Sequence, residues 1–232
     1  MVRQALSALN WSMRRWAILL GTLLGSALGQ GFGFVYYMGF TWTLPTDLTV
    51  VQRGYPDAVV KGAEFSGRDF TYPWYYGVRL WYGEAAGLRY ELELIHHKLY
   101  FEGAVENADL FERFTVTDGF NYLLFNLAYP LSDGPLRAVG RVGVGVMLPH
   151  PETEVRGQAY GVDGDWRYYQ FGGFGAQVGV SVEPVGSGPI GLTGNLEGKL
   201  TLASSRFTIA NGYAQGFFFS LHGVLGVGLR SP

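Results

Sequence analysis

Small or polar side chains alternate with large apolar ones along eight separate stretches of this chain. In residues 32–43, for example, a large and mostly aromatic side chain stands at every even position. A period of two is the pattern of a β-strand with two different faces, and no helical pattern persists after residue 30. The sequence therefore predicts an all-β fold. The eight predicted strands are residues 32–43, 70–82, 88–95, 114–129, 137–148, 166–183, 190–203 and 213–229.

The connections between these stretches alternate in length. Those after the second, fourth and sixth strands are turn-like (GEAAG, SDGP and VGSGP), whereas those after the first, third and fifth are longer. Short turns at one end and long loops at the other are typical of an outer-membrane barrel with both termini in the periplasm. We expect an eight-stranded antiparallel up-and-down transmembrane β-barrel in the outer membrane of a Gram-negative-type envelope. We also expect it to be a monomer whose partner is the outer-membrane lipid.

The two faces of the predicted strands differ in charge. One face is nearly uncharged and heavily aromatic, which suits contact with lipid. The other carries glycine and opposite charges in balance, and a small barrel interior holds such charges when each is paired. These charges are Arg79, Arg89, Arg137, Arg141 and Lys199 against Glu91, Glu93 and Glu197. The alternative is a soluble eight-stranded barrel such as a lipocalin, but it would expose a far larger apolar surface to water than monomers tolerate.

Composition excludes several classes of function. The net charge is only −2, so no strongly basic surface indicates a nucleic-acid partner. The chain has no cysteine, which excludes disulfides, thiolate metal sites and cysteine nucleophiles. An eight-stranded lumen is filled by side chains, so the chain is not a porin. Function must therefore come from the loops or from the lipid-facing rim.

The N-terminal segment has the pattern of a secretory signal. Arg14 and Arg15 precede an apolar run, residues 16–24, and Ala27-Leu28-Gly29 supplies small residues at the cleavage positions. The rival interpretation is a membrane anchor, but the run is shorter than the roughly 20 residues that a bilayer requires. We expect a signal peptide at 1–29 and the barrel at 30–232. Met13 would make a more typical start than Met1, so residues 1–12 are open to interpretation as a start-site artefact.

The stretch MLPHPETEVRG, residues 147–157, begins the third long loop. The third, fourth and fifth strands are neighbours, so their outer ends gather polar residues in one region. These are His96, His97, Lys98, Asp118, Asn121, His150, Glu152, Glu154 and Arg156. Continued alternation would point His96, Lys98 and His150 outward and His97 inward.

This chemistry has a functional and a plain interpretation. Cations at the rim would contact lipid phosphates and sugars, and imidazole with carboxylates suits several divalent ions, which makes His150 and Glu152 candidate metal ligands. On the plain interpretation, His97 belongs to the lumen and residues 150–156 form a solvated loop. His222 is expected to be an interior hydrogen-bonding residue.

Four segments together resemble the lipid A oxidase-like outer-membrane β-barrel family. They are DFTYPWYYGVRLWY (69–82), ELELIHHKLYFE (91–102), RFTVTDGFNYLLFN (113–126) and GVGVMLPHPETEVRG (143–157). The similarity runs along roughly residues 32–229. The family's motifs correspond to His96 and Lys98 in the third strand, Asp118, Gly119 and Asn121 in the fourth, and Pro149, His150 and Glu152 in the third loop.

The resemblance implies an enzyme that oxidises the proximal glucosamine of lipid A to an aminogluconate unit with molecular oxygen. His150, Glu152, His96 and Asp118 would be catalytic, with a histidine or carboxylate acting as base on the sugar and a divalent metal assisting with oxygen. Lys98, Asn121, Arg156 and Glu154 would bind the substrate, with Lys98 and Arg156 on its phosphates. The other class that stays open is a non-catalytic structural or interaction barrel of the outer membrane.

Overall fold

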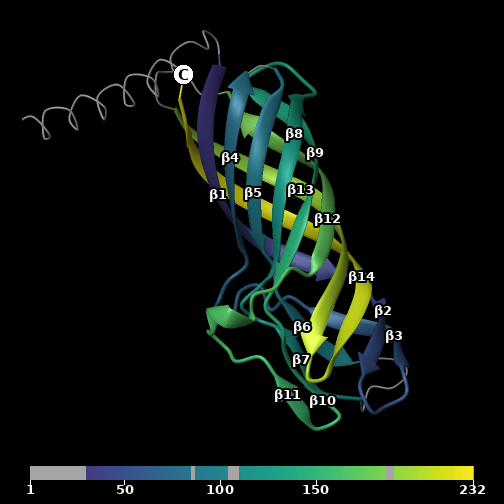
Figure 1. Ribbon diagram of the computed structural model, residues 1–232. Helices are drawn as coiled ribbons and strands as arrows, with labels where there is room; N and C mark the ends of the chain where they lie inside the picture. The colour runs from purple at the N-terminus through teal and green to yellow at the C-terminus, as the bar shows by residue number, and fades with distance from the viewer. Residues whose placement is uncertain (1–29, 85–86, 104–109, 186–190, 232) are drawn as a thin grey trace, which may run out of the picture.

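The computed structural model describes residues 30–84, 87–103, 110–185 and 191–231; the predicted signal peptide lies outside them. Eight of its strands form one antiparallel wall, and β1 pairs with β14 to close it (Figure 1). In spatial order they are β1 (Gln30–Thr43), β4 (Tyr76–Glu84), β5 (Arg89–His96), β8 (Phe120–Pro130), β9 (Leu136–Pro149), β12 (Gly173–Pro184), β13 (Gly191–Ile209) and β14 (Gly212–Arg230). The prediction of an eight-stranded antiparallel barrel is confirmed.

Paired charges fill the inside of the barrel. Arg79 contacts Glu93 at 2.7 Å and Glu197 at 2.9 Å, and Arg141 contacts Glu91 at 2.7 Å. Four cations and four carboxylates take part in this lumen network, so its formal charges cancel. Its members are Arg79, Arg89, Arg141, Lys199, Glu91, Glu93, Glu183 and Glu197. The inward placement predicted from alternation is thereby confirmed, with Arg137 half-buried near one mouth of the barrel.

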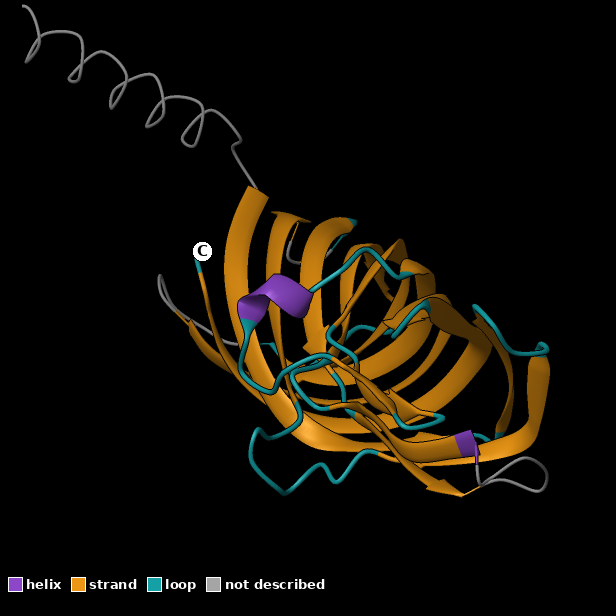
Figure 2. Cartoon of the chain, turned by 60° about the horizontal axis from the view of Figure 1, so that its bottom comes forward, coloured by secondary structure: helices purple, strands orange, loops and turns teal. Residues whose placement is uncertain are grey.

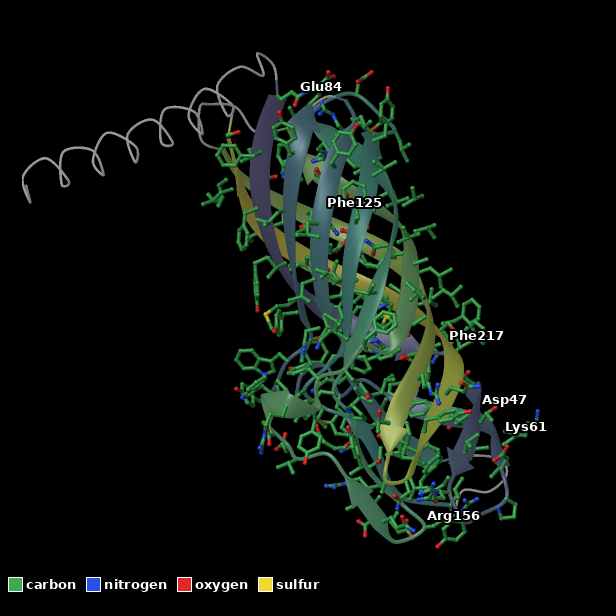
Figure 3. The ribbon with its side chains drawn as sticks, in the orientation of Figure 1. Asp47, Lys61, Glu84, Phe125, Arg156 and Phe217 are labelled. Carbon is green, nitrogen blue, oxygen red and sulfur yellow. The ribbon has the colours of Figure 1, made fainter. Side chains whose placement is uncertain are left out.

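The outside of the barrel is apolar. Phe125 is 52% exposed, Val144 66% and Leu225 68%, and each belongs to the outward set of its strand. Figure 3 shows Phe125 projecting from the middle of the wall. So large an apolar exterior around an interior of paired charges is stable in lipid and not in water.

The two ends of the barrel differ. The chain between β4 and β5, β8 and β9, and β12 and β13 spans only residues 85–88, 131–135 and 185–190. These connections lie at the same end as the start of β1 and the C-terminus (Figure 1). The three long connections, 44–75, 97–119 and 150–172, lie at the other end, which is the outer one by the logic of short periplasmic turns. The last connection is a two-residue turn, 210–211.

The long loops carry six further strands, which continue the sheet of the barrel wall beyond the outer rim. Strands β13 and β14 each run 19 residues, longer than the rest of the wall, and the first residues of β14 pair with β2. From there the sheet continues in the order β2, β3, β6, β7, β10 and β11. We call this part the outer cap. Its strands are β2 (Thr46–Gln52), β3 (Ala58–Ser66), β6 (Leu99–Gly103), β7 (Phe111–Val116), β10 (Glu152–Val155) and β11 (Gln158–Tyr160). Figure 2 turns this end toward the reader, with its connecting loops in teal.

Aromatic packing holds the outer cap on the barrel. Phe65 of β3 and Phe120 of β8 both contact Phe218 of β14, with ring centroids 5.7 and 5.1 Å apart. Phe207 of β13 packs edge-on against Phe114 of β7 at 5.4 Å. Aromatic pairs of this geometry add to the free energy of burying their area. The cap and the upper barrel therefore share one apolar core, which fixes the loops that carry the rim residues.

Three predicted strand boundaries are wrong. The strand expected at 70–82 begins only at Tyr76, because Pro73 cannot donate to a sheet ladder. The strand expected at 114–129 is broken into β7 and β8 at Gly119, whose positive φ of 119° turns the chain. The strand expected at 166–183 begins at Gly173, and Trp166–Tyr168 is instead a short 3-10 turn, η2. The cap strands were not predicted, because short strands in loops carry too little alternation to be distinguished.

Candidate functional site

Three of the predicted catalytic side chains meet just above the barrel rim. The Nδ1 atom of His150 lies 3.1 Å from a carboxylate oxygen of Glu152 and 3.6 Å from one of Asp118. One ligand atom from each residue falls within 4.8 Å of the others. His150 is fully buried and Glu152 is 4% exposed, while the side chain of Asp118 is 20% exposed. We call these three residues the rim triad.

The local chain explains why the triad forms. His150 follows β9 directly, and its backbone N–H donates to the carbonyl of Gly119 at 3.0 Å. That bond brings the turn between β7 and β8, which carries Asp118, against the end of β9. Glu152 opens β10 and pairs with Thr115 of β7. The triad is therefore assembled from the second and third long loops.

Hydrogen bonds fix the orientation of each triad member. Nε2 of His150 lies 2.8 Å from the carbonyl oxygen of Asp165, which can only accept, so Nε2 carries a proton. Thr117 donates to Glu152 at 2.5 Å, and the backbone N–H of Gly164 donates to Asp118 at 2.7 Å. The remaining ring nitrogen, Nδ1, therefore faces two carboxylate oxygens.

That arrangement fits a divalent cation. Nδ1 of His150 and one oxygen from each of Glu152 and Asp118 lie within 4.8 Å of one another, so a cation held between them would contact all three. Imidazole with carboxylates is a donor set for several first-row ions. Three protein ligands also leave coordination positions for a substrate or water, as catalytic metal sites do. The residues present thus fit the metal that the sequence predicted at His150 and Glu152, with Asp118 added.

A groove on the lipid-facing side of the wall adjoins the triad. Its volume is about 360 Å³, and its walls are Tyr76, Leu94, His96, Asn121, Leu148, Tyr169, Gln170 and Phe171. The hydroxyl of Tyr169 donates to the carbonyl of Asp118 at 2.7 Å, and its ring lies 4.9 Å from that of His150. Tyr169 therefore separates the triad from the groove while contacting both.

His96 is positioned in this groove by two contacts. Its ring stacks on Tyr76 with centroids 4.8 Å apart, and Nδ1 lies 2.9 Å from Oδ1 of Asn121. The amide nitrogen of Asn121 donates to the carbonyl of Leu148 at 3.2 Å, which orients Oδ1 toward His96 as an acceptor. Nδ1 is then the protonated nitrogen, and Nε2 is a base without a hydrogen-bond partner among the described residues.

The other predicted rim residues lie elsewhere. Lys98 was expected to point outward, but it is buried and its ammonium donates to the carbonyls of Arg68 and Thr71 at 2.8 and 2.7 Å. Burial lowers the pKa of this ammonium. Arg156 lies at the far end of the outer cap, where it donates to the carbonyl of Pro56 at 3.1 Å (Figure 3). Glu154 sits in β10 opposite Arg113. The prediction that Lys98, Glu154 and Arg156 belong to the rim site is therefore wrong. The long loops that carry them fold into a tall sheet, which places them elsewhere.

The exposure expected for His150 was also wrong. Tyr168 and Tyr169 cover its ring, with centroids 6.1 and 4.9 Å away, so it does not face the lipid directly. His97 points inward as predicted, 5.5 Å from the ring of His222, and His222 bonds Thr201 at 2.8 Å in the interior.

Two contributors to the site were missed from sequence. Tyr169 and the carbonyl of Asp165 come from the stretch DWRYYQF, where the alternation of side chains predicts a strand. Arg167 bonds the side chain of Asp165 and lowers the pKa of that carboxyl to about 2. Burial raises the pKa of the Tyr169 hydroxyl, so this hydroxyl stays a donor. The density of aromatic residues at a membrane rim was the signal that could have indicated the segment.

Fold and site together define the class: the chain is an eight-stranded outer-membrane β-barrel with a polar, partly enclosed cluster at its outer-leaflet rim. Among the described residues no helix is long and apolar enough to cross a membrane. No protein-family model matches the sequence, and no curated protein matches it.

The solved structures that are similar to it at a low level include the following three. Ail, the attachment invasion locus protein of Yersinia pestis, is 9% identical over 84% of this chain and 98% of that chain, with a TM-score of 0.33. The structure of Ail with the heparin analogue sucrose octasulfate has the same identity and coverage and a TM-score of 0.31. An outer-membrane channel from Pseudomonas putida F1 is 10% identical over 85% of this chain and 95% of that chain, with a TM-score of 0.21. At these TM-scores the similarity says nothing about what this chain binds or catalyses.

Proposed function

We propose that this barrel is a lipid-modifying enzyme of the outer leaflet, whose substrate is lipid A and whose reaction is oxidation of the proximal glucosamine. The observation that carries the proposal is the rim triad beside a lipid-facing groove that holds an unpartnered histidine nitrogen. The resemblance of the segments around His96, Asp118 and His150 to lipid A oxidase-like barrels supports the choice of substrate and reaction.

The groove supports sideways entry of a lipid headgroup. Leu94, Leu148 and Phe171 give it apolar walls, whereas His96 and Asn121 supply polar atoms at the same height. A headgroup sugar could enter from the membrane plane while its acyl chains stay in the bilayer. Sites that bind small ligands commonly combine such apolar walls with a few directed polar groups.

Different residues would carry out different parts of this oxidation. The reaction requires a proximal glucosamine whose C1 is a free hemiacetal and not a glycosyl phosphate. Its oxidation to a lactone removes two electrons and two protons, which reduce molecular oxygen to hydrogen peroxide, and water then opens the lactone to the aminogluconate. Nε2 of His96 would accept the hydroxyl proton, and the amide of Asn121 holds that ring in place. Asp118, His150 and Glu152 would hold a divalent cation, which supplies Lewis acidity and, for a redox-active ion, a path for electrons. The hydroxyl of Tyr169, at the boundary of groove and triad, orients the headgroup.

The experiment is mass spectrometry of lipid A from a host that expresses the protein and whose lipid A has a free C1 hydroxyl on the proximal glucosamine. Wild-type protein is expected to add the mass change of glucosamine oxidation, while His96→Gln and Glu152→Gln lower the product at least about 100-fold, as loss of a general base or a metal ligand does. Glu102→Gln, an exposed carboxylate of the cap, is the matched control and should leave the product unchanged. Heat-modified migration on gels reports whether each variant is folded.

A non-catalytic barrel gives a different result. The outer cap, with its rigid aromatic core, is the feature that favours an interaction role. If the folded wild-type protein leaves lipid A unchanged in a host that makes it, the enzymatic proposal is wrong and this alternative stands.

A further inference from the structure

A second depression lies in the lipid-facing wall, away from the rim triad. Its volume is about 450 Å³, and it lies between β9, β12, β13 and β14. Its floor is Ala176, which pairs with Val144 on one side and Leu202 on the other. Neighbouring outward positions of β12 carry Phe174 and Val178, so the single alanine makes the hollow. The depression is almost entirely apolar, as a site for an acyl chain should be.

This depression continues outward into a larger hollow of about 760 Å³, whose lining mixes polar and apolar side chains. Phe174, Ser204 and Phe217 line both parts, so they form one path up the wall. Figure 3 shows Phe217 at the junction of barrel and cap, with Asp47 just beyond it. Aromatic residues at this height mark the level of the lipid headgroups. Polar side chains therefore join the lining at the level of the membrane interface.

Arg206 supplies positive charge to this outer hollow. It lies two residues beyond Ser204 on β13, or about 7 Å further from the membrane centre. Its guanidinium carbon lies over the ring of Tyr213, 3.4 Å from the ring centroid, and the arginine is exposed. The carboxylate in the hollow, Asp47, is bonded by Lys61 at 2.8 Å and by the backbone of Gly62. The two cations outweigh the one carboxylate, which favours an anion here.

Two uncharged polar side chains share the outward face with Arg206. Gln215 of β14 pairs with Arg206 on one side and with Thr49 of β2 on the other, and all three line the hollow. Ser205 is buried on the opposite face of β13, because successive side chains of a strand alternate, so it takes no part.

We propose that this two-part groove binds a phosphate-bearing glycolipid of the outer leaflet, with one acyl chain over Ala176, the phosphate at Arg206 and sugar hydroxyls among Thr49 and Gln215. The volume of the outer hollow, about 760 Å³, is large enough for a sugar headgroup, which is bulkier than a glycerophosphate. Phe171 lines both this hollow and the groove of the rim triad, so the two sites lie on opposite sides of one loop segment. The inference does not rest on the proposed oxidation, because binding here requires no chemistry.

The test measures lipid binding to the purified full chain in detergent by native mass spectrometry. The probes are diphosphorylated lipid A, phosphatidylglycerol and inorganic phosphate. Two variants change the groove: Arg206→Gln removes the charge, and Ala176→Phe fills the floor. Arg167→Gln removes an exposed cation outside the groove, and Val180→Phe enlarges a residue on the same face of β12 below it.

We expect lipid A to bind, and each groove variant to weaken it about tenfold, the effect of one charge-assisted contact or one blocked chain site. The two control variants should bind like wild type. Unchanged binding in both groove variants, or equal weakening in the controls, would overturn the proposal. Phosphatidylglycerol binding as tightly as lipid A, with the same dependence on Arg206, would overturn the assignment to a glycolipid. If inorganic phosphate displaced lipid A at equal concentration, the acyl-chain site over Ala176 would be wrong. Intact binding with no oxidised product would contradict the proposed reaction alone.

Discussion

Replacing Glu93 with glutamine should destabilise the barrel through its lumen network. This carboxylate contacts Arg79 at 2.7 Å and Lys199 at 2.6 Å, and it accepts from Tyr37 at 2.5 Å and Asn126 at 2.7 Å. Removing one partner of a buried ion pair costs about 3–5 kcal/mol, because the other charge stays buried without compensation. Arg79 and Lys199 keep Glu197, at 2.9 and 3.3 Å. We therefore expect the lower figure, about 3 kcal/mol.

A second change should recover part of that loss. In the single variant four buried cations face three carboxylates, whereas Glu93→Gln combined with Lys199→Met restores three of each. The double variant should regain about half of the lost stability, since contacts within one network are not additive. Glu102→Gln, which breaks the exposed pair with Arg68, is the control and should cost under about 1 kcal/mol.

The assay is equilibrium unfolding by urea in detergent micelles, followed by tryptophan fluorescence. It gives the free energy of unfolding for each variant on one scale. A loss under about 1 kcal/mol for Glu93→Gln would show that the lumen charges are not coupled as the distances indicate. So would a double variant that loses as much as the two single variants added together.

Three further predictions concern the site, the pH response and the N-terminus. After treatment with a chelator, the protein should bind one Mn²⁺ or Zn²⁺ ion per chain by calorimetry, and Glu152→Gln should weaken this at least tenfold; equal binding by both proteins would contradict the rim triad as ligands. Burial, with smaller contributions from His96 and Lys98, lowers the pKa of His97 to about 3. The unfolded chain then binds the extra proton first, so stability should fall as pH decreases from about 6.5 toward 3, and His97→Gln should flatten that fall in unfolding experiments; an unchanged pH profile would refute this. Finally, N-terminal sequencing of the membrane fraction should begin at Gln30; a sequence starting at Met1 or Met13 would refute cleavage.

The barrel was predictable because its signal is local and repeated. The alternation around Val142 and Val144 in β9, and around Leu196 and Leu200 in β13, depends only on which side of a strand meets lipid. The lumen network followed from the same parity, since a charge that cannot face lipid must face inward. Part of the rim triad was also predictable, because His150 and Glu152 come just after β9, and Asp118 lies in the turn just before β8, the neighbouring strand.

The remaining features depend on how the long loops fold. Lys98 and Arg156 have the same residue types as lipid-binding cations, yet the outer cap buries one and carries the other to its far tip. Tyr169 joined the site through a loop whose path no local pattern encodes.

The sequence by itself determined the eight strands of the wall and which of their side chains face lipid or lumen along the strand centres. Only the tertiary structure decided which rim residues touch, because contacts between loops depend on packing around a shared aromatic core. Phe65, Phe114 and Phe218 come from three distant segments, and their packing places Asp118 beside His150 while it moves Arg156 away.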